Sequence, residues 1–169
     1  GGAFAEMQVS HASIRDALQT QLSSAVLGKE DAEEMSSVPW SKVQFNASGK
    51  KLLVTAKRGL VMMLDGFDAS VGHIFLNDTS AATGDENVAP GIDVIDKAPS
   101  ACFSPDDQTI LVGGYDGVVR CYSAESGAEL SRLEEGHPTG SAVGCVACSP
   151  NLAVVATSCV NTALWSWSS

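Results

Sequence analysis

Two cysteines near the C-terminal end of the chain have the spacing of half a zinc site. Cys145 and Cys148 are separated by two residues, and structural zinc sites commonly combine two such pairs. The 169-residue chain contains five cysteines but no second pair with this spacing. The surrounding segment is also predicted to be a β-strand, in which residues three apart point to opposite faces and cannot bind one ion. We therefore predict buried thiols and no metal site.

Three histidines raise the question of nucleophilic catalysis, namely His11, His73 and His137. Such catalysis also needs a positioned nucleophile, yet the sequence has neither a strand–turn–helix nucleophile elbow nor a paired-carboxylate motif. Residues 113–117, Gly-Gly-Tyr-Asp-Gly, are rich in glycine but lack the lysine and the following helix of a phosphate-binding loop. The sequence thus predicts no catalytic residue and no cofactor.

Acidic residues outnumber basic residues by 20 to 10, which gives a formal net charge of -10. This charge repels phosphate backbones, so we expect no direct binding of nucleic acid. The chain has no apolar stretch of roughly 20 residues and no secretory signal, so we expect an intracellular protein without membrane association. One basic cluster could contact a phosphopeptide or simply form a solvated sheet edge: Lys50, Lys51, Lys57 and Arg58.

The most informative feature is a short segment that occurs three times. Residues 101–105, Ala-Cys-Phe-Ser-Pro, align with residues 146–150, Val-Ala-Cys-Ser-Pro, and with residues 43–47, Val-Gln-Phe-Asn-Ala. The first two copies are offset by 45 residues, within the roughly 40 to 45 residues of a common β-repeat. The remaining offset is 58 residues, and the polar segment 77–97 accounts for the excess as a loop inserted between two repeats.

Each repeat continues with turns and further strands. Asp116-Gly117 is a strong signal for a tight hairpin. Several strands are apolar at consecutive positions, as in Ile110-Leu111-Val112, so both faces of their sheet must be covered. Four antiparallel strands per repeat are typical of the blade of a β-propeller. The predicted second strands are residues 51–56, 109–113 and 153–158, and the predicted third strands are residues 60–64, 118–122 and 162–167. Fourth strands are predicted in two repeats, at residues 73–76 and 129–133.

These strands divide the chain into three blades, at 39–76, 98–135 and 136–169, of which the last lacks its outermost strand. Residues 1–9 are expected to form the outermost strand of a preceding blade. Residues 10–38 are expected to be an insertion loop, although the spacing of Ile14, Leu18 and Leu22 also fits a helix over residues 12–26. Closed propellers have four to eight blades, so we predict an all-β fold that is the C-terminal part of a larger, seven-bladed ring.

The repeats also carry motifs of a known family. Gly136-His137 precedes the third blade and Trp165 lies in its third strand, as in WD repeats. Further matching segments are Trp-Ser-Lys-Val-Gln-Phe at 40–45, Leu-Asp-Gly-Phe at 64–67, Glu-Ser-Gly at 125–127 and Ser-Cys-Val-Asn-Thr-Ala-Leu-Trp at 158–165. With these residues the chain resembles the WD repeat-containing protein 82 family, and the resemblance implies a WD40-type β-propeller.

The resemblance also implies a structural role for several residues. WD repeats contain a buried hydrogen-bond relay that joins a histidine, a hydroxyl, an acid and an indole N–H. In the third blade His137, Thr157 and Trp165 match this relay, with Asn161 in place of the acid. Asp116, in the second blade, is the one tight-turn acid that the sequence retains.

The function that the resemblance implies is that of a non-catalytic scaffold in the nucleus. It would serve a histone lysine methyltransferase complex of the COMPASS type and phosphatase complexes of transcription termination. The implied partners are the methyltransferase catalytic subunit, a phosphatase-targeting subunit and the phosphorylated C-terminal repeats of RNA polymerase II. Two alternatives stay open, because fold alone does not decide function. They are a WD-repeat scaffold of an unrelated intracellular complex and a propeller enzyme, which would need clustered acids or metal ligands at its central channel.

Overall fold

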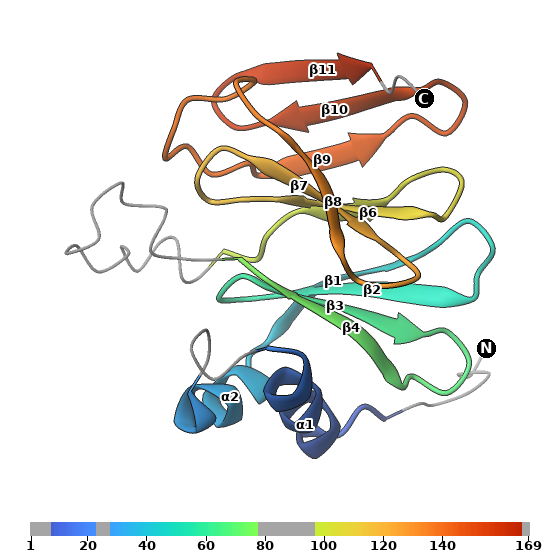
Figure 1. Cartoon of the computed structure of the whole chain (residues 1–169), viewed down its shortest axis with the longest axis vertical. Coiled ribbons are helices and arrows are strands. Elements are labelled where there is room, and N and C mark those ends of the chain that lie inside the picture. Colours follow the sequence, from blue (N-terminus) through green and yellow to red (C-terminus); the bar gives the residue numbers. More distant parts are fainter. Residues whose placement is uncertain (1–7, 23–27, 78–96, 167–169) are drawn as a thin grey trace, which may run out of the picture.

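Three antiparallel β-sheets lie face to face, and two helices cover the outer face of the first sheet (Figure 1). The computed structural model describes residues 8–22, 28–77 and 97–166. Within each sheet the strands are hydrogen-bonded in chain order, so every sheet is a meander of hairpins. This is the arrangement of propeller blades. Within the described ranges, neither helix is long and apolar enough to cross a membrane.

The strands of the three sheets agree closely with those predicted. The second, third and fourth strands are all present in the described residues, with ends shifted by at most two residues. The first sheet comprises β1 (Trp40–Phe45), β2 (Lys51–Ala56), β3 (Leu60–Asp65) and β4 (Val71–Leu76). The second comprises β5 (Ala101–Phe103), β6 (Thr109–Gly113), β7 (Val119–Ser123) and β8 (Glu129–Leu133). The third comprises β9 (Cys145–Cys148), β10 (Val154–Ser158) and β11 (Thr162–Ser166).

Two expectations about chain segments fall outside the described residues. The strand expected at 1–9 lies almost wholly in residues 1–7, and the insertion expected at 77–97 lies almost wholly in residues 78–96.

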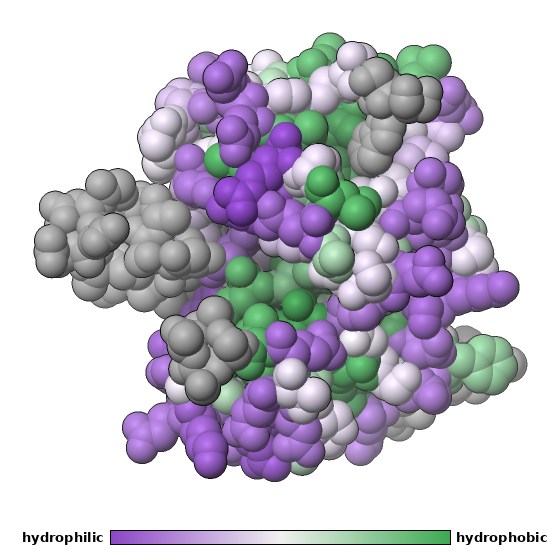
Figure 2. Space-filling model, viewed as in Figure 1, coloured by the Kyte–Doolittle hydropathy of each residue, from purple (hydrophilic) through white to green (hydrophobic). Residues whose placement is uncertain are grey.

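The strand β2 shows how one strand contributes to two cores. Leu52 and Val54 pack in the core between the first sheet and the helices, whereas Leu53 packs in the core between the first and second sheets. Successive side chains of a strand point to opposite faces, so apolar residues at consecutive positions fill both cores. A third core, which includes Leu111 and Val119, lies between the second and third sheets. Figure 2 shows polar side chains over most of the face it presents, with apolar side chains reaching the surface in patches between them.

Helix α1 (His11–Gln21) lies where the spacing of Ile14 and Leu18 fitted a helix. Ser10 begins the helix, because its side chain accepts a hydrogen bond from the backbone N–H of Ser13 at 3.0 Å. The helix ends five residues before the predicted end at residue 26. Ile14 and Leu18 are four residues apart on one helical face, and both pack in the core shared with the first sheet.

The acidic run at residues 30–34, expected to be a loop, forms most of helix α2 (Lys29–Ser36). Glu30 and Asp31 lie in its first turn, where exposed backbone N–H groups stabilise carboxylates. Ala32 and Met35 are buried in the same core as α1. The two helices therefore cover the sheet face on which a neighbouring blade packs in a propeller, and both contribute side chains to the core.

Polar side chains connect neighbouring sheets. The Asp107 carboxylate, in the turn between β5 and β6, accepts hydrogen bonds from the backbone N–H groups of Ala47 at 2.7 Å and Ser48 at 2.9 Å. The buried Asn77 side chain, just after β4, donates to the Gly113 carbonyl at 2.9 Å. These bonds fix the second sheet relative to the first.

Candidate functional site

The predicted relay of the third blade joins β10 and β11 to the segment before β9. The indole Nε1–H of Trp165, on β11, donates to Thr157 Oγ1, on β10, at 2.7 Å. His137 Nε2 lies 2.7 Å from the same hydroxyl oxygen. His137 and Thr157 are both buried, where a polar group without a partner costs about 1–3 kcal/mol. The structure therefore brings three of the predicted relay residues together, and their hydrogen bonds connect the strands of the last blade.

The fourth relay position is occupied by Cys159 and not by Asn161. Cys159 Sγ lies 3.2 Å from His137 Nδ1. Asn161 is exposed, and its backbone N–H donates to Cys159 Sγ at 3.4 Å. The prediction for Asn161 is wrong because residues two apart share a face of an extended strand. Cys159 follows β10 directly and lies on the same side as Thr157, whereas Asn161 lies across the turn.

Asp116 has a different role, in the turn between β6 and β7. Its carboxylate accepts hydrogen bonds from the Val118 N–H at 3.1 Å and from Arg120 Nη1 at 3.2 Å. Burial acts to raise the pKa of Asp116, but the bonds from Arg120 and Val118 and the charge of Arg120 lower it overall. Asp116 thus fixes a turn within the second blade, and the structure places it outside the His137 relay.

The predicted basic cluster is divided between the two ends of β2. Lys50 and Lys51 lie at the turn before β2 and at its first residue, whereas Lys57 and Arg58 lie at the turn after it. At about 3.3 Å per residue, β2 separates the two pairs by about 20 Å or more. Carboxylates of β3 and α2 pair with Lys51 and Arg58, at N–O distances of 3.0 and 2.8 Å. The four side chains therefore do not form a single phosphopeptide site.

The cysteines of β9 point to opposite faces of the third sheet. Cys148 packs against the core between the second and third sheets, and its Sγ lies 3.6 Å from that of Cys102. Cys145 is exposed, so the prediction that its thiol is buried is wrong. No described element covers the outer face of the third sheet, onto which it projects. In the described ranges, no group of three or more His, Cys, Asp or Glu side chains is placed to hold a metal ion.

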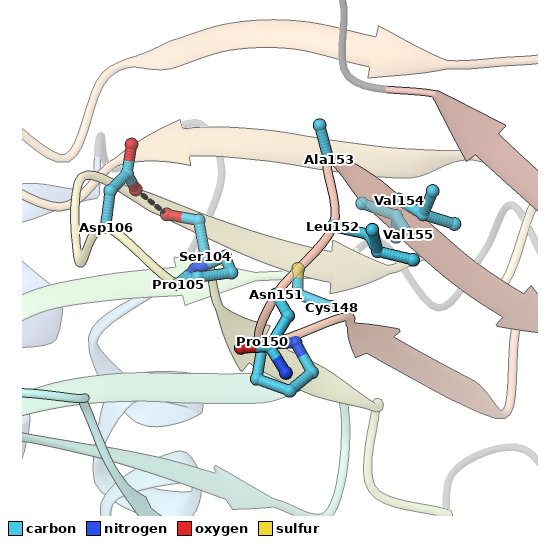
Figure 3. Close-up of a pocket in the computed structure, with 10 residues that line it drawn as sticks. All are labelled: Ser104, Pro105, Asp106, Cys148, Pro150, Asn151, Leu152, Ala153, Val154 and Val155. Carbon is cyan, nitrogen blue, oxygen red and sulfur yellow. Dashed lines mark hydrogen bonds between the residues drawn. The ribbon is translucent and has the colours of Figure 1, made fainter.

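A groove lies on one rim of the molecule, where β1, β5 and β9 end. Its first half is a pocket of about 300 Å³ between the turns that follow β5 and β9 (Figure 3). An adjoining depression of about 290 Å³ extends it toward the end of β1. We call the two together the rim groove. Its lining residues are 44–47 from the first sheet, 103–106 from the second, and Cys148 with 150–155 from the third.

The repeat explains why these residues meet. The three aligned segments of the sequence form β1, β5 and β9 and the turns after them. Equivalent positions of successive blades lie side by side when the blades stack about an axis. Phe45, Phe103 and Cys148 are equivalent in the alignment, and the following turns carry Pro105 and Pro150. The aligned segments therefore carry the signal for the groove, although by themselves they predict only strand ends and turns.

The lining of the rim groove combines apolar side chains with a few fixed polar groups. Phe45 and Leu152 are 57% and 67% exposed. Ser104 Oγ accepts a hydrogen bond from the Thr109 N–H at 2.9 Å and donates one to Asp106. The hydrogen bond from Ser104 lowers the pKa of Asp106, which lies at the edge of the groove. Such a surface suits contact with an apolar segment of another protein.

Comparisons with known proteins agree with this architecture. The family model "WD domain, G-beta repeat" matches residues 98–123. WD repeat-containing protein 82 of Drosophila melanogaster is 31% identical over 126 residues, which make up 75% of this chain and 35% of that protein. The chain thus spans about a third of the relative's length. A chain in a crystal structure of the mitotic checkpoint complex has a TM-score of 0.55 at 16% identity, over 76% of this chain and 37% of that chain.

The comparisons and the geometry identify the same architecture. The matched WD repeat covers β5, β6 and β7, in the middle of the three stacked sheets. The structural likeness, at its low identity, shows the fold alone. Together with the matched WD repeat and the stacked antiparallel sheets, it confirms the predicted all-β, WD40-type β-propeller. The chain therefore contains a WD repeat and is similar, over three quarters of its length, to WD repeat-containing protein 82.

Proposed function

We propose that this chain is a non-catalytic scaffold that binds protein partners at the rim groove. The observation that carries the proposal is an apolar groove between turns that are already held by hydrogen bonds. Asp107 joins the turns of the first and second sheets, and Ser104 and Asp106 close the turn after β5. A preformed surface loses little conformational entropy when a partner docks, which favours binding.

We further propose that the partners belong to nuclear complexes. The support is the 31% identity to WD repeat-containing protein 82, since a fold shared by many proteins does not select a partner. The proposed partners are the catalytic subunit of a COMPASS-type histone methyltransferase, a phosphatase-targeting subunit of transcription termination, and phosphorylated C-terminal repeats of RNA polymerase II. The split basic cluster offers no single phosphate site, so docking at the groove is proposed to depend on apolar contacts.

The test is affinity capture of the tagged full-length protein from nuclear extract, with quantitative mass spectrometry of the three named partners. The variant Phe45→Glu places a charge in the rim groove. An interface aromatic of this kind contributes about 2 kcal/mol to the free energy of binding, so the affinity should fall by roughly 30-fold and capture should fall with it. Phe67→Glu is the matched control, because Phe67 is 94% exposed and lies outside the groove.

The outcomes separate the two levels of the proposal. Equal capture by the Phe45→Glu and Phe67→Glu variants would reject the groove as the docking surface. Recovery of a stable complex that lacks both methyltransferase and phosphatase subunits would reject the nuclear assignment and favour a scaffold of an unrelated complex. Imaging of the tagged protein provides an independent check, since exclusion from the nucleus contradicts the assignment.

A further inference from the structure

Two cysteine sulfurs from neighbouring sheets lie close together beside the rim groove. Cys102 belongs to β5 and Cys148 ends β9, 46 residues later in the chain. Their Sγ atoms are 3.6 Å apart, and both are free thiols. The remaining cysteines lie elsewhere: Cys121 is on β7, Cys145 is exposed, and Cys159 is hydrogen-bonded to His137.

A hydrogen bond links the two segments beside the cysteines. The Val146 N–H donates to Ser100 Oγ at 2.9 Å, and each of these residues precedes one of the two cysteines by two positions. Side chains two apart on a strand share a face, so this bond aligns the facing sides of β5 and β9 where the thiols lie. The contact between the sulfurs is therefore fixed by the packing of the two sheets.

The contact makes one of the two sulfurs more reactive, and one member of the pair is accessible from the groove. The hydrogen bond from the Cys148 thiol lowers the pKa of Cys102 despite its burial, and the charge of Lys42 adds to this effect. The same bond raises the pKa of Cys148. Thiolates are the reactive form of cysteine, and the hydrogen bond between the two thiols favours ionisation of one of them. Cys148 is half-buried and lines the groove (Figure 3), where a small oxidant can reach its sulfur.

We propose that Cys102 and Cys148 form a disulfide bond between the second and third sheets when the protein meets hydrogen peroxide. Two S–H bonds and the O–O bond of the peroxide break, one S–S bond forms, and the thiol protons leave in two water molecules. The thiols lose two electrons, which reduce the peroxide. A disulfide has an S–S distance of about 2.05 Å, so the sulfurs must approach by about 1.5 Å, which rotation of the two side chains can supply.

The bond would cross-link the first strands of two adjacent blades. It closes the chain between residues 102 and 148 and so reduces the conformational freedom of the unfolded state. For a loop of this length in a protein of this size, the expected rise in Tm is at most roughly 16 °C, and it should disappear on reduction. The proposal needs only the packing of the two sheets, so it does not depend on the proposed scaffold function.

The test is disulfide mapping of the full chain after treatment with hydrogen peroxide, blocking of free thiols and digestion with trypsin. Cleavage after the basic residues releases Cys102 alone in peptide 98–120, Cys121 alone in peptide 121–132, and the other three cysteines in peptide 133–169. Cys102, Cys121 and the group of three remaining cysteines are thus found in three different peptides. The expected product is peptide 98–120 linked to peptide 133–169, with a mass two hydrogens below the sum of the two peptides.

Serine variants assign the bond. The link should persist in Cys145→Ser, the matched control on the same strand, and disappear in Cys102→Ser and Cys148→Ser. Because Cys148 is only half-buried, Cys148→Ser provides a test even if Cys102→Ser does not fold. Absence of the link in the wild-type chain, a link through peptide 121–132, or a link that persists in Cys148→Ser would each overturn the proposal.

Discussion

Replacing Leu18 by alanine tests whether the helix pair is part of the core. Leu18 is fully buried, with 0% exposure, and it packs with Ile14, Met35 and residues of the first sheet. Truncation to alanine leaves only Cβ and creates a cavity between the helices and the sheet. Buried leucines replaced in this way destabilise proteins by about 2–5 kcal/mol, depending on how far the surroundings can close the cavity.

The structure indicates that the groups around Leu18 cannot shift far enough to fill this cavity. Gln21, at the end of α1, donates from Nε2 to the Gly72 carbonyl and accepts at Oε1 from the Ile74 N–H, both at 2.9 Å. These two bonds hold α1 on β4, so the helix cannot move freely into the cavity. We therefore expect a loss of about 3 kcal/mol in the free energy of unfolding. For a protein of this size the loss corresponds to a decrease in Tm of roughly 6–12 °C.

The assay is urea unfolding followed by circular dichroism, for the wild-type chain, Leu18→Ala and Gln19→Ala. Gln19 is the neighbouring residue on the exposed side of α1, and its replacement should change the free energy of unfolding by about 0.5 kcal/mol or less. A clear difference between the two variants is expected. Equally small effects would refute the reasoning, because Leu18 could then not lie between the helices and the sheet.

Two further predictions concern the polar groups of the second and third blades. Thr157→Val keeps the shape of the side chain but removes the hydroxyl shared by His137 and Trp165, so stability in urea should fall by about 2 kcal/mol or more, whereas Thr157→Ser should lose less. The reverse order would contradict the relay. The folded state lowers the pKa of Asp116, so its charge stabilises the fold above its unfolded pKa of about 3.9, and this contribution is lost as the pH falls through the folded pKa. The stability difference between wild-type and Asp116→Asn should therefore shrink below about pH 4, and a difference that stays constant from neutral to acidic pH would contradict the Arg120 contact.

The candidate site was predictable in its parts but not in its assembly. The sequence placed Phe45, Phe103 and Cys148 at equivalent points of the repeat, and the structure brings these points together in the rim groove. Whether neighbouring turns leave a groove depends on the spacing of the sheets, which no single repeat encodes. The predicted basic cluster is divided for a related reason. The extended strand β2 lies between its two pairs of residues, so closeness in sequence does not bring their side chains together.

The sequence by itself determined the strands, the turns and the stacking of blades. Short-range signals carry this information, because turn residues constrain the backbone locally and apolar residues at consecutive positions require cover on both faces. The tertiary structure alone decided which atoms meet across many residues. Examples are the helices on the first sheet, Cys159 on His137, and Cys102 beside Cys148. The physical reason is that such contacts arise from the packing of whole sheets and helices, where a shift of one residue along a strand or turn brings a different side chain into position.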